Sequence, residues 1–179
     1  MTVRTEPDQT IELGAATLRR YRDDDLDDLV RAVDESEDHL RPWLPWVAGH
    51  SRESEAAFLA QSVRDWESGT AYGYAIRAGG AFAGGIGLMA RIGPGGLEIG
   101  YWVHRDYTRR GLATAASAAL VEQAFRLPGV DRVEIVVDEL NLASSGIPRK
   151  LGFTPAGRRR LDPPAPEGTG VGVVWQLTR

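Results

Sequence analysis

The chain has 179 residues, of which 42% are hydrophobic and 26% charged, and its formal net charge is −4. These values predict a single soluble globular domain over residues 1–179 and argue against a general nucleic-acid-binding protein. The absence of cysteine excludes disulfides, thiolate metal sites and cysteine nucleophiles. No apolar run is long enough to span a membrane and no signal-peptide core is present, so we expect a cytoplasmic protein without a membrane partner.

The first third of the chain alternates short strands with helices. Strands are predicted over 11–13 and 17–21, joined by a turn at Gly14. Acids at 23–25 open a helix whose apolar stripe comprises Leu26, Leu29, Val30 and Val33. A second helix is predicted over 51–67, capped by Ser51 or Ser54, with inward-facing Phe58, Leu59, Val63 and Trp66.

The middle of the chain predicts a hairpin followed by a strand, a turn and a helix. The hairpin strands cover 71–78 and 81–91 and turn at Gly79-Gly80. Three glycines weaken its second strand, which indicates either a bulge or the close approach of a ligand: Gly84, Gly85 and Gly87. The next strand places Leu97, Ile99, Tyr101 and Val103 on one face and Glu98, Gly100 and Trp102 on the other.

A glycine-containing turn, Thr108 to Gly111, then opens an Ala-rich helix over 112–125. The first turn of a helix presents unpaired N–H groups and the positive end of the helix dipole, so an anionic group such as a phosphate binds well there. One glycine-opened helix is a weak signal by itself, because an ordinary helix start has the same sequence. A second segment is needed to identify the ligand.

The last third predicts a strand over 132–138, a short helix over 141–151, and strands over 154–160 and 171–177. Pro148 lies in the short helix and lacks a backbone donor, so we expect that helix to begin only just before it. The predicted fold is α/β (α+β): one domain with a central, mostly antiparallel mixed sheet of about seven strands flanked by helices.

Two segments carry a family resemblance. Thr-Arg-Arg-Gly-Leu-Ala, residues 108–113, resembles the acetyl-CoA loop of the GNAT acyltransferases, usually written Q/R-x-x-G-x-G/A, although Thr108 departs from its first position. Residues 141–153 resemble the N-x-x-S-x-x-v-x-e-K-l-G-F element of that family without a gap. The stretches 98–103 and 39–46 are similar to the RimJ/RimL-like ribosomal-protein N-terminal acetyltransferase branch, and the resemblance covers residues 10–178.

The resemblance implies a cofactor, acetyl-CoA, and residues that bind it. Its pyrophosphate would lie on the loop and first helical turn, formed by Arg109, Arg110, Gly111, Leu112, Ala113 and Thr114. The pantetheine arm would lie along the 98–103 strand, against Trp102 and Val103, with Asn141 and Ser144 on its far side. The alternative is structural: a helix N-cap at Thr108 and a turn at Asn141.

Catalysis requires a neutral amine, a polarised thioester carbonyl and a proton for the departing thiolate. Glu98 is the candidate base, acting through a water, and a structural salt bridge is an equally weighted alternative. Ser144 is the candidate group that stabilises the thiolate or relays its proton, with Ser145 as the second choice. Family members often carry a tyrosine acid where this chain has Pro148, which excludes that acid here.

The acceptor site is expected at His39, Trp43 and Trp46, which belong to the corresponding segment of the resembling branch. Packing is the alternative for tryptophans beside prolines. The histidines share no metal-ligand spacing, so no metal site is predicted. The late loop carries Asp162 and Glu167, which either cover the acceptor and attract a cationic amine or form a plain surface loop.

The functional hypothesis is an acetyl-CoA-dependent N-acetyltransferase that acts by direct transfer in a ternary complex, since there is no thiol for a covalent intermediate. Its first acceptor hypothesis is a protein N-terminal α-amine. The alternatives are a small amine, such as an antibiotic, amino acid or polyamine, and a non-catalytic acyl-CoA-binding protein. A homodimer is compatible with the sequence, which leaves the oligomeric state open.

Overall fold

The computed structural model describes residues 5–179, which form one sheet and four α-helices. The strands are β1 Thr10–Glu12, β2 Thr17–Arg20, β3 Ala71–Ala78, β4 Ala81–Met89, β5 Gly96–Val103, β6 Arg132–Asp138, β7 Thr154–Arg160 and β8 Val171–Thr178. The α-helices are α1 Leu26–Leu40, α2 Arg52–Ser68, α3 Leu112–Arg126 and α4 Leu142–Lys150. Short 3-10 helices are η1 Asp23–Asp25, η2 Pro45–Gly49 and η3 Arg105–Tyr107.

The eight strands form one mixed sheet in the order β1-β2-β3-β4-β5-β6-β8-β7. Neighbouring strands are antiparallel except β5 and β6, which are parallel because α3 crosses between them. The predicted fold class is confirmed, with one strand more than the expected seven.

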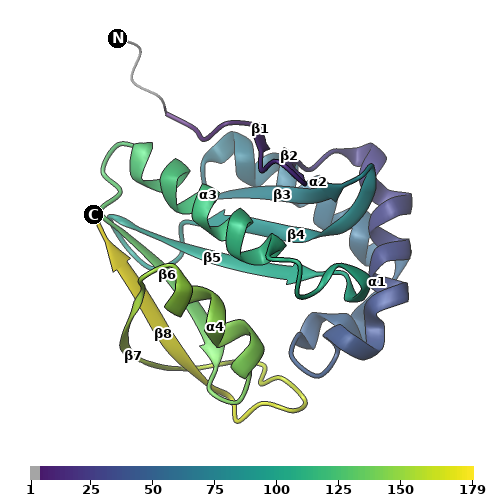
Figure 1. Cartoon of the computed structure of the whole chain (residues 1–179). Coiled ribbons are helices and arrows are strands. Elements are labelled where there is room, and N and C mark those ends of the chain that lie inside the picture. The colour runs from purple at the N-terminus through teal and green to yellow at the C-terminus, as the bar shows by residue number, and fades with distance from the viewer. Residues whose placement is uncertain (1–4) are drawn as a thin grey trace.

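The parallel pair β5–β6 stays together for only half of its length. Pairing runs from Gly96 and Arg132 to Ile99 and Ile135, and ends there. Beyond this point β5 continues beside β4 as far as Val103, and β6 continues beside β8 as far as Asp138. The sheet therefore opens into a V, with residues 100–103 and 136–138 on its two inner edges (Figure 1).

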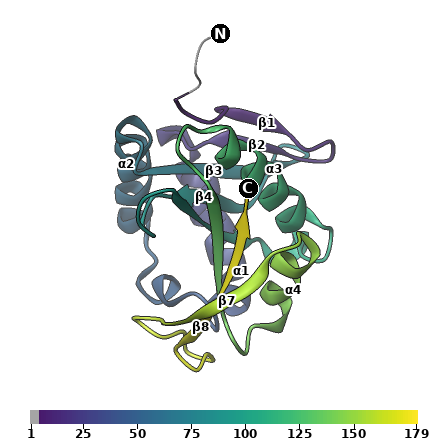
Figure 2. The same ribbon diagram turned by 90° about the vertical axis from the view of Figure 1, so that its left-hand side faces the viewer.

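The helices cover both faces of the sheet. Helices α1 and α2 lie on one face, and α3 and α4 lie on the other (Figure 2). The larger hydrophobic cluster lies mainly between the sheet and α3, and includes Leu97, Ile99, Leu120 and Ile135. The smaller cluster joins α1 and α2 to the opposite face through Leu29, Val33, Leu59, Ala75 and Phe82. No helix in residues 5–179 is long and apolar enough to cross a membrane.

Two local predictions are wrong. Phe58 does not face inward: its side chain is 44% exposed, whereas the adjacent Leu59 is 2% exposed. Successive helical residues point about 100° apart, so α2 buries Leu59 and leaves only the edge of the Phe58 ring against Tyr21. Helix α4 does not begin just before Pro148: it begins at Leu142, because Asn141 Oδ1 accepts a hydrogen bond from the Ser144 N–H at 3.1 Å and caps the helix.

The glycines of β4 show why that strand tolerates them. The β3–β4 pairing shifts register beside Gly84, which has a φ of +151°. A Cβ atom at Gly84 would lie 2.3 Å from the Trp102 carbonyl oxygen of β5. Gly84 is therefore explained by a pairing irregularity and by the close approach of the neighbouring strand.

Candidate active site where β5 and β6 diverge

The first turn of α3 has open backbone donors at the V of the sheet. The N-cap residue Gly111 supplies no side-chain cap, and the first turn contains no acid. Each of the other three α-helices of residues 5–179 has a side-chain cap or first-turn acids. The N–H groups of Leu112, Ala113 and Thr114 are thus available to an external anion, as the sequence led us to expect.

The loop before α3 is shaped for the same purpose. Arg109 and Gly111 both have left-handed backbone conformations, with φ values of 59° and 75°. Left-handed residues within a turn direct successive N–H groups into a concave anion-binding surface. A Cβ atom added at Gly111 would meet nothing within 4 Å, so the surface is open. Arg110 lies over the Tyr107 ring, 5.0 Å from its centroid, which holds this second cation beside the loop.

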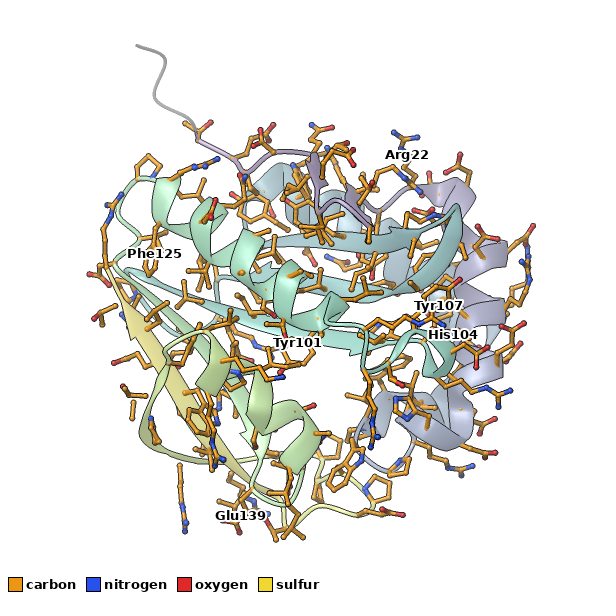
Figure 3. The ribbon with its side chains drawn as sticks, viewed as in Figure 1. Arg22, Tyr101, His104, Tyr107, Phe125 and Glu139 are labelled. Carbon is orange, nitrogen blue, oxygen red and sulfur yellow. The ribbon has the colours of Figure 1, made fainter. Side chains whose placement is uncertain are left out.

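His104 links η3, the segment before this loop, to helix α1 by hydrogen bonds. Its Nδ1 accepts a hydrogen bond from the Asp106 N–H at 3.1 Å, so Nε2 carries the proton toward the Glu35 carboxylate, 2.9 Å away. The Arg105 N–H also donates to Ser36 Oγ at 3.1 Å. Helix α1 therefore positions η3 and the turn that follows; Figure 3 shows His104 and Tyr107 close to α1.

Asn141 and Ser144 lie on the opposite side of the V from β5. Asn141 caps α4, which uses its Oδ1 and leaves its amide nitrogen without a partner among the described residues. Ser144 is half-buried, whereas Ser145 is only 5% exposed. Ser144 is therefore the more accessible of the two serines.

Glu98 is buried and doubly paired. Its side chain is 4% exposed, and Arg159 of β7 donates to Oε2 at 2.5 Å. Arg91 donates to Oε1 through Nε at 3.2 Å and also through a terminal nitrogen. The structure thus contains the salt bridge that was the alternative to a catalytic base. Each carboxylate oxygen thus accepts at least one hydrogen bond from an arginine, and a base role would compete with these ion pairs.

An aromatic cluster, formed by Trp46, Trp102, Phe82, Tyr21 and Phe58, lies on the α1–α2 face. Trp102 stacks on Phe82 with ring centroids 6.0 Å apart and meets the edge of Trp46 at 6.2 Å. The predicted cofactor residue Trp102 thus directs its ring to this face, and its backbone alone lies on the inner edge of the V. The backbone of Val103 lies on the same edge.

The segment His39–Trp46 and the late loop 161–170 meet beside the V. The Glu167 N–H donates to the Pro42 carbonyl oxygen at 3.0 Å. Trp43 is half-buried and Trp46 is 43% exposed, so these side chains are accessible from this face. Partial burial and, less strongly, the nearby His104 lower the pKa of His39, which favours the neutral ring.

Four contributors to the site were missed by the sequence analysis: Arg91, Arg159, Glu35 and Asp138. The buried Asp138 carboxylate accepts hydrogen bonds from the N–H groups of Leu140, Thr169 and Gly170, at 3.0 to 3.3 Å. It therefore holds the late loop against the end of β6. Most of these contacts join residues that are 31 to 69 positions apart, as for Asp138 with the late loop and Glu35 with His104, and no local sequence pattern predicts them. Among the described residues, no cluster of three His, Asp or Glu side chains could hold a metal ion.

Comparison with known proteins gives concordant results. The model of the acetyltransferase (GNAT) domain family matches residues 16–154. "Putative ribosomal N-acetyltransferase YdaF" of Bacillus subtilis (strain 168) is 27% identical over 150 residues, covering 80% of each chain. The structure of the microcin C7 self-immunity acetyltransferase MccE, with acetyl-CoA and AMP, superposes with a TM-score of 0.87 at 17% identity, covering 96% of this chain and 97% of that one.

RimL, a ribosomal L7/L12 alpha-N-protein acetyltransferase solved with coenzyme A, gives a TM-score of 0.86 at 21% identity, covering 94% of this chain and 97% of that one. The geometry defines an α/β domain with an anion-binding helix start beside a diverging sheet. The chain belongs to the GNAT acetyltransferase family. It is thus an acetyltransferase, and its relatives support a place in the RimJ/RimL-like branch.

Proposed function

We propose that the chain transfers an acetyl group from acetyl-CoA to a protein N-terminal α-amine, by direct transfer in a ternary complex. The observation that carries this proposal is the uncapped start of α3, which lies beside two unpaired strand edges. The structures of MccE and RimL hold acetyl-CoA and coenzyme A, respectively, which supports the same donor here.

The residues at the V fit such a donor. The N–H groups of Gly111 to Thr114 would hold the pyrophosphate, and the guanidinium groups of Arg109 and Arg110 would add positive charge. The inner edge of β5, at residues 100–103, offers unpaired backbone groups to the amides of a pantetheine arm. A bound donor would supply the activated acetyl group, and the Ser144 hydroxyl would donate a hydrogen bond to the departing sulfur.

The acceptor would approach from the α1–α2 face, where His39, Trp43 and Trp46 form one wall. The printed names of YdaF and RimL both refer to ribosomal N-acetyltransferase activity, which supports a protein amine. Tryptophan side chains provide large contact areas with a polar edge, and this suits a peptide. Because the chain has no cysteine, the amine has no thioester enzyme intermediate to attack, and direct transfer is the simpler route.

Glu98 has two proposed roles, a counter-ion for two arginines and a general base, and the observed contacts favour the first. As a counter-ion it holds Arg91 and Arg159 at the site, and this role needs no rearrangement. As a base acting through a water it would have to accept a proton while it is paired with two arginines, which disfavour the protonated carboxyl. We therefore place the counter-ion role first and keep the base role as the prediction that experiment must decide.

A small amine is the second candidate acceptor. The hydrogen bond from Glu167 to Pro42 joins the late loop to the His39–Trp46 segment, which would favour a compact substrate over a long peptide at this place. MccE, which has the same fold, is named as a self-immunity acetyltransferase for microcin C7 and not as a ribosomal one, which supports keeping this candidate.

A thiol-release assay separates these candidates. Acetyl-CoA is incubated with the protein and either N-terminal peptides or small amines, and free thiol is followed. We expect turnover with peptides and initial-rate patterns that require both substrates to be bound together. Strong turnover of a small amine with all peptides inert would overturn the first acceptor assignment. Stabilisation of the fold by acetyl-CoA without turnover of any amine would favour the non-catalytic alternative.

The Trp46→Ala substitution tests the acceptor wall. Trp46 is 43% exposed, so its loss is expected to change the free energy of unfolding by less than about 1 kcal/mol. We expect the KM for the peptide to rise about tenfold, as for the loss of one aromatic contact, while the KM for acetyl-CoA stays unchanged.

Phe58→Ala is the matched control, because Phe58 is 44% exposed and lies at the other end of the aromatic cluster. Its acceptor KM is expected to stay within twofold of the wild-type value. If both substitutions raised the acceptor KM equally, the effect would come from the cluster as a whole, and Trp46 would not be a wall of the acceptor site.

A further inference from the structure

Pro148 removes one hydrogen bond from the interior of α4. A residue at this place in a helix donates its N–H to the carbonyl four residues earlier, which is that of Ser144. Proline has no N–H, so this donor is missing. Pro148 is fully buried, and water cannot replace the lost donor from that side. The carbonyl that loses its helical partner belongs to Ser144, which is also the residue proposed to donate a hydrogen bond to the thiolate.

The Tyr101 phenol supplies the hydrogen-bond donor that residue 148 lacks. Its hydroxyl donates to the Ser144 carbonyl oxygen, with 3.1 Å between the two oxygens. Tyr101 belongs to the part of β5 that has no β6 partner, and Figure 3 shows its side chain between β5 and α4. Because α4 follows β6 in the chain, this hydrogen bond joins the two arms of the V on the side of α3 and α4.

The hydrogen bond from Tyr101 to Ser144 lies where the distance between β5 and β6 is not fixed by sheet pairing. Backbone pairing stops at Ile99 and Ile135, so no sheet hydrogen bond sets the distance between β5 and β6 beyond that point. The first turn of α4 carries both Asn141 and Ser144, which would contact the pantetheine arm. The hydrogen bond from Tyr101 joins β5 to this turn and so helps to set how far the Ser144 hydroxyl lies from the inner edge of β5.

We propose that Tyr101 is a positioning residue for Ser144: it replaces the hydrogen bond that Pro148 removes and thereby fixes α4 against β5 at the reacting thioester. This inference rests on the proposed function. It assigns Tyr101 no proton transfer. Burial raises the pKa of the Tyr101 phenol, so the phenol is a poor acid and a persistent donor.

A double-mutant cycle with Tyr101→Phe and Pro148→Ala tests the inference, because alanine restores the N–H at residue 148 and also favours the helix. In the wild-type background, Tyr101→Phe is expected to lower kcat about fivefold, as for the loss of one hydrogen bond, with both KM values within twofold. In the Pro148→Ala background, the same substitution is expected to lower kcat by less than about twofold.

Tyr72→Phe is the control for the chemical change alone, because the Tyr72 hydroxyl has no hydrogen-bond partner in residues 5–179 and its ring packs against Trp66, away from the V. It should leave kcat unchanged. An equal loss of kcat from Tyr101→Phe in both backgrounds would overturn the inference, since Tyr101 would then act on the substrates directly. No loss in the wild-type background would overturn it as well.

The same double-mutant cycle can be measured by equilibrium unfolding in urea, which requires no substrate. Tyr101→Phe is expected to lower the folding equilibrium constant about fivefold with Pro148 present and by less than about twofold with alanine there. If the wild-type protein acetylated no amine, the proposed function would fail while this coupling in unfolding would still be found. Absence of the coupling in a protein that does acetylate amines would overturn the role of Tyr101 alone.

Discussion

Replacing Gly111 by glutamate is expected to abolish the stabilisation of the fold by acetyl-CoA. The new carboxylate would stand at the helix start where the pyrophosphate is expected, and would repel it. A ligand present at 100 times its Kd stabilises a protein by about 2.7 kcal/mol, and we expect this increment to fall to near zero. The measurement is the shift in the thermal unfolding midpoint on addition of acetyl-CoA.

The Gly111→Glu variant should still fold. No atom lies within 4 Å of an added Cβ, and the left-handed backbone costs about 1–2 kcal/mol for a residue other than glycine. Gly129→Glu is the matched control: Gly129 has the same φ of 75°, its Cβ position is equally open, and it lies beyond the far end of α3. This control should lose the same stability and keep the full shift. Retained stabilisation in Gly111→Glu would show that the loop does not bind the cofactor.

Glu98→Gln is expected to lower the free energy of unfolding by about 1–3 kcal/mol, because three charge-assisted hydrogen bonds, two from Arg91 and one from Arg159, lose their anion. Arg91 and Arg159 are 59% and 40% exposed, so water can solvate them again and the cost stays below that of a fully buried pair. If Glu98 is a counter-ion, turnover should fall by less than about a hundredfold and keep its acid-side pH dependence.

A general base gives a different result. Its removal lowers turnover by about 10² to 10⁴ and removes the pH dependence that its own titration causes. Arg159→Leu separates the roles further, because it frees Oε2 of Glu98 while leaving Arg91 in place. Turnover that rises or holds in Arg159→Leu but falls in Glu98→Gln by the larger factor would establish Glu98 as the base and contradict the counter-ion role.

The elements of the fold could be predicted from local patterns. The alternation along 97–103 placed Leu97 and Ile99 toward the core and Trp102 on the opposite face, and the structure confirms both assignments. The turn signal at Gly79-Gly80 gave the β3–β4 hairpin correctly. Phe58 was misplaced because helical periodicity identifies an apolar stripe but not which member at its margin turns outward.

The site could be predicted only where a motif is continuous in sequence. The segments 108–114 and 141–144 open α3 and α4, and their roles in binding the cofactor stay predictions. The pairing of Glu98 with Arg159 could not be predicted, since the two residues are 61 apart in sequence, whereas Arg91 is only seven residues away and was overlooked. The start of α4 was misplaced because Pro148 was treated as a boundary. Asn141 nucleates the helix earlier, and the Tyr101 hydroxyl compensates for the missing N–H.

The most direct test of the proposed function uses two peptides that share one sequence with an internal lysine and differ only in a free or a formylated N-terminus. Each is incubated with acetyl-CoA, and the acetylated position is found by fragmentation mass spectrometry. We predict acetyl transfer to the α-amine of the free peptide and none to the formylated one. Acetylation of lysine in both peptides at equal rates would contradict transfer to a protein N-terminal α-amine.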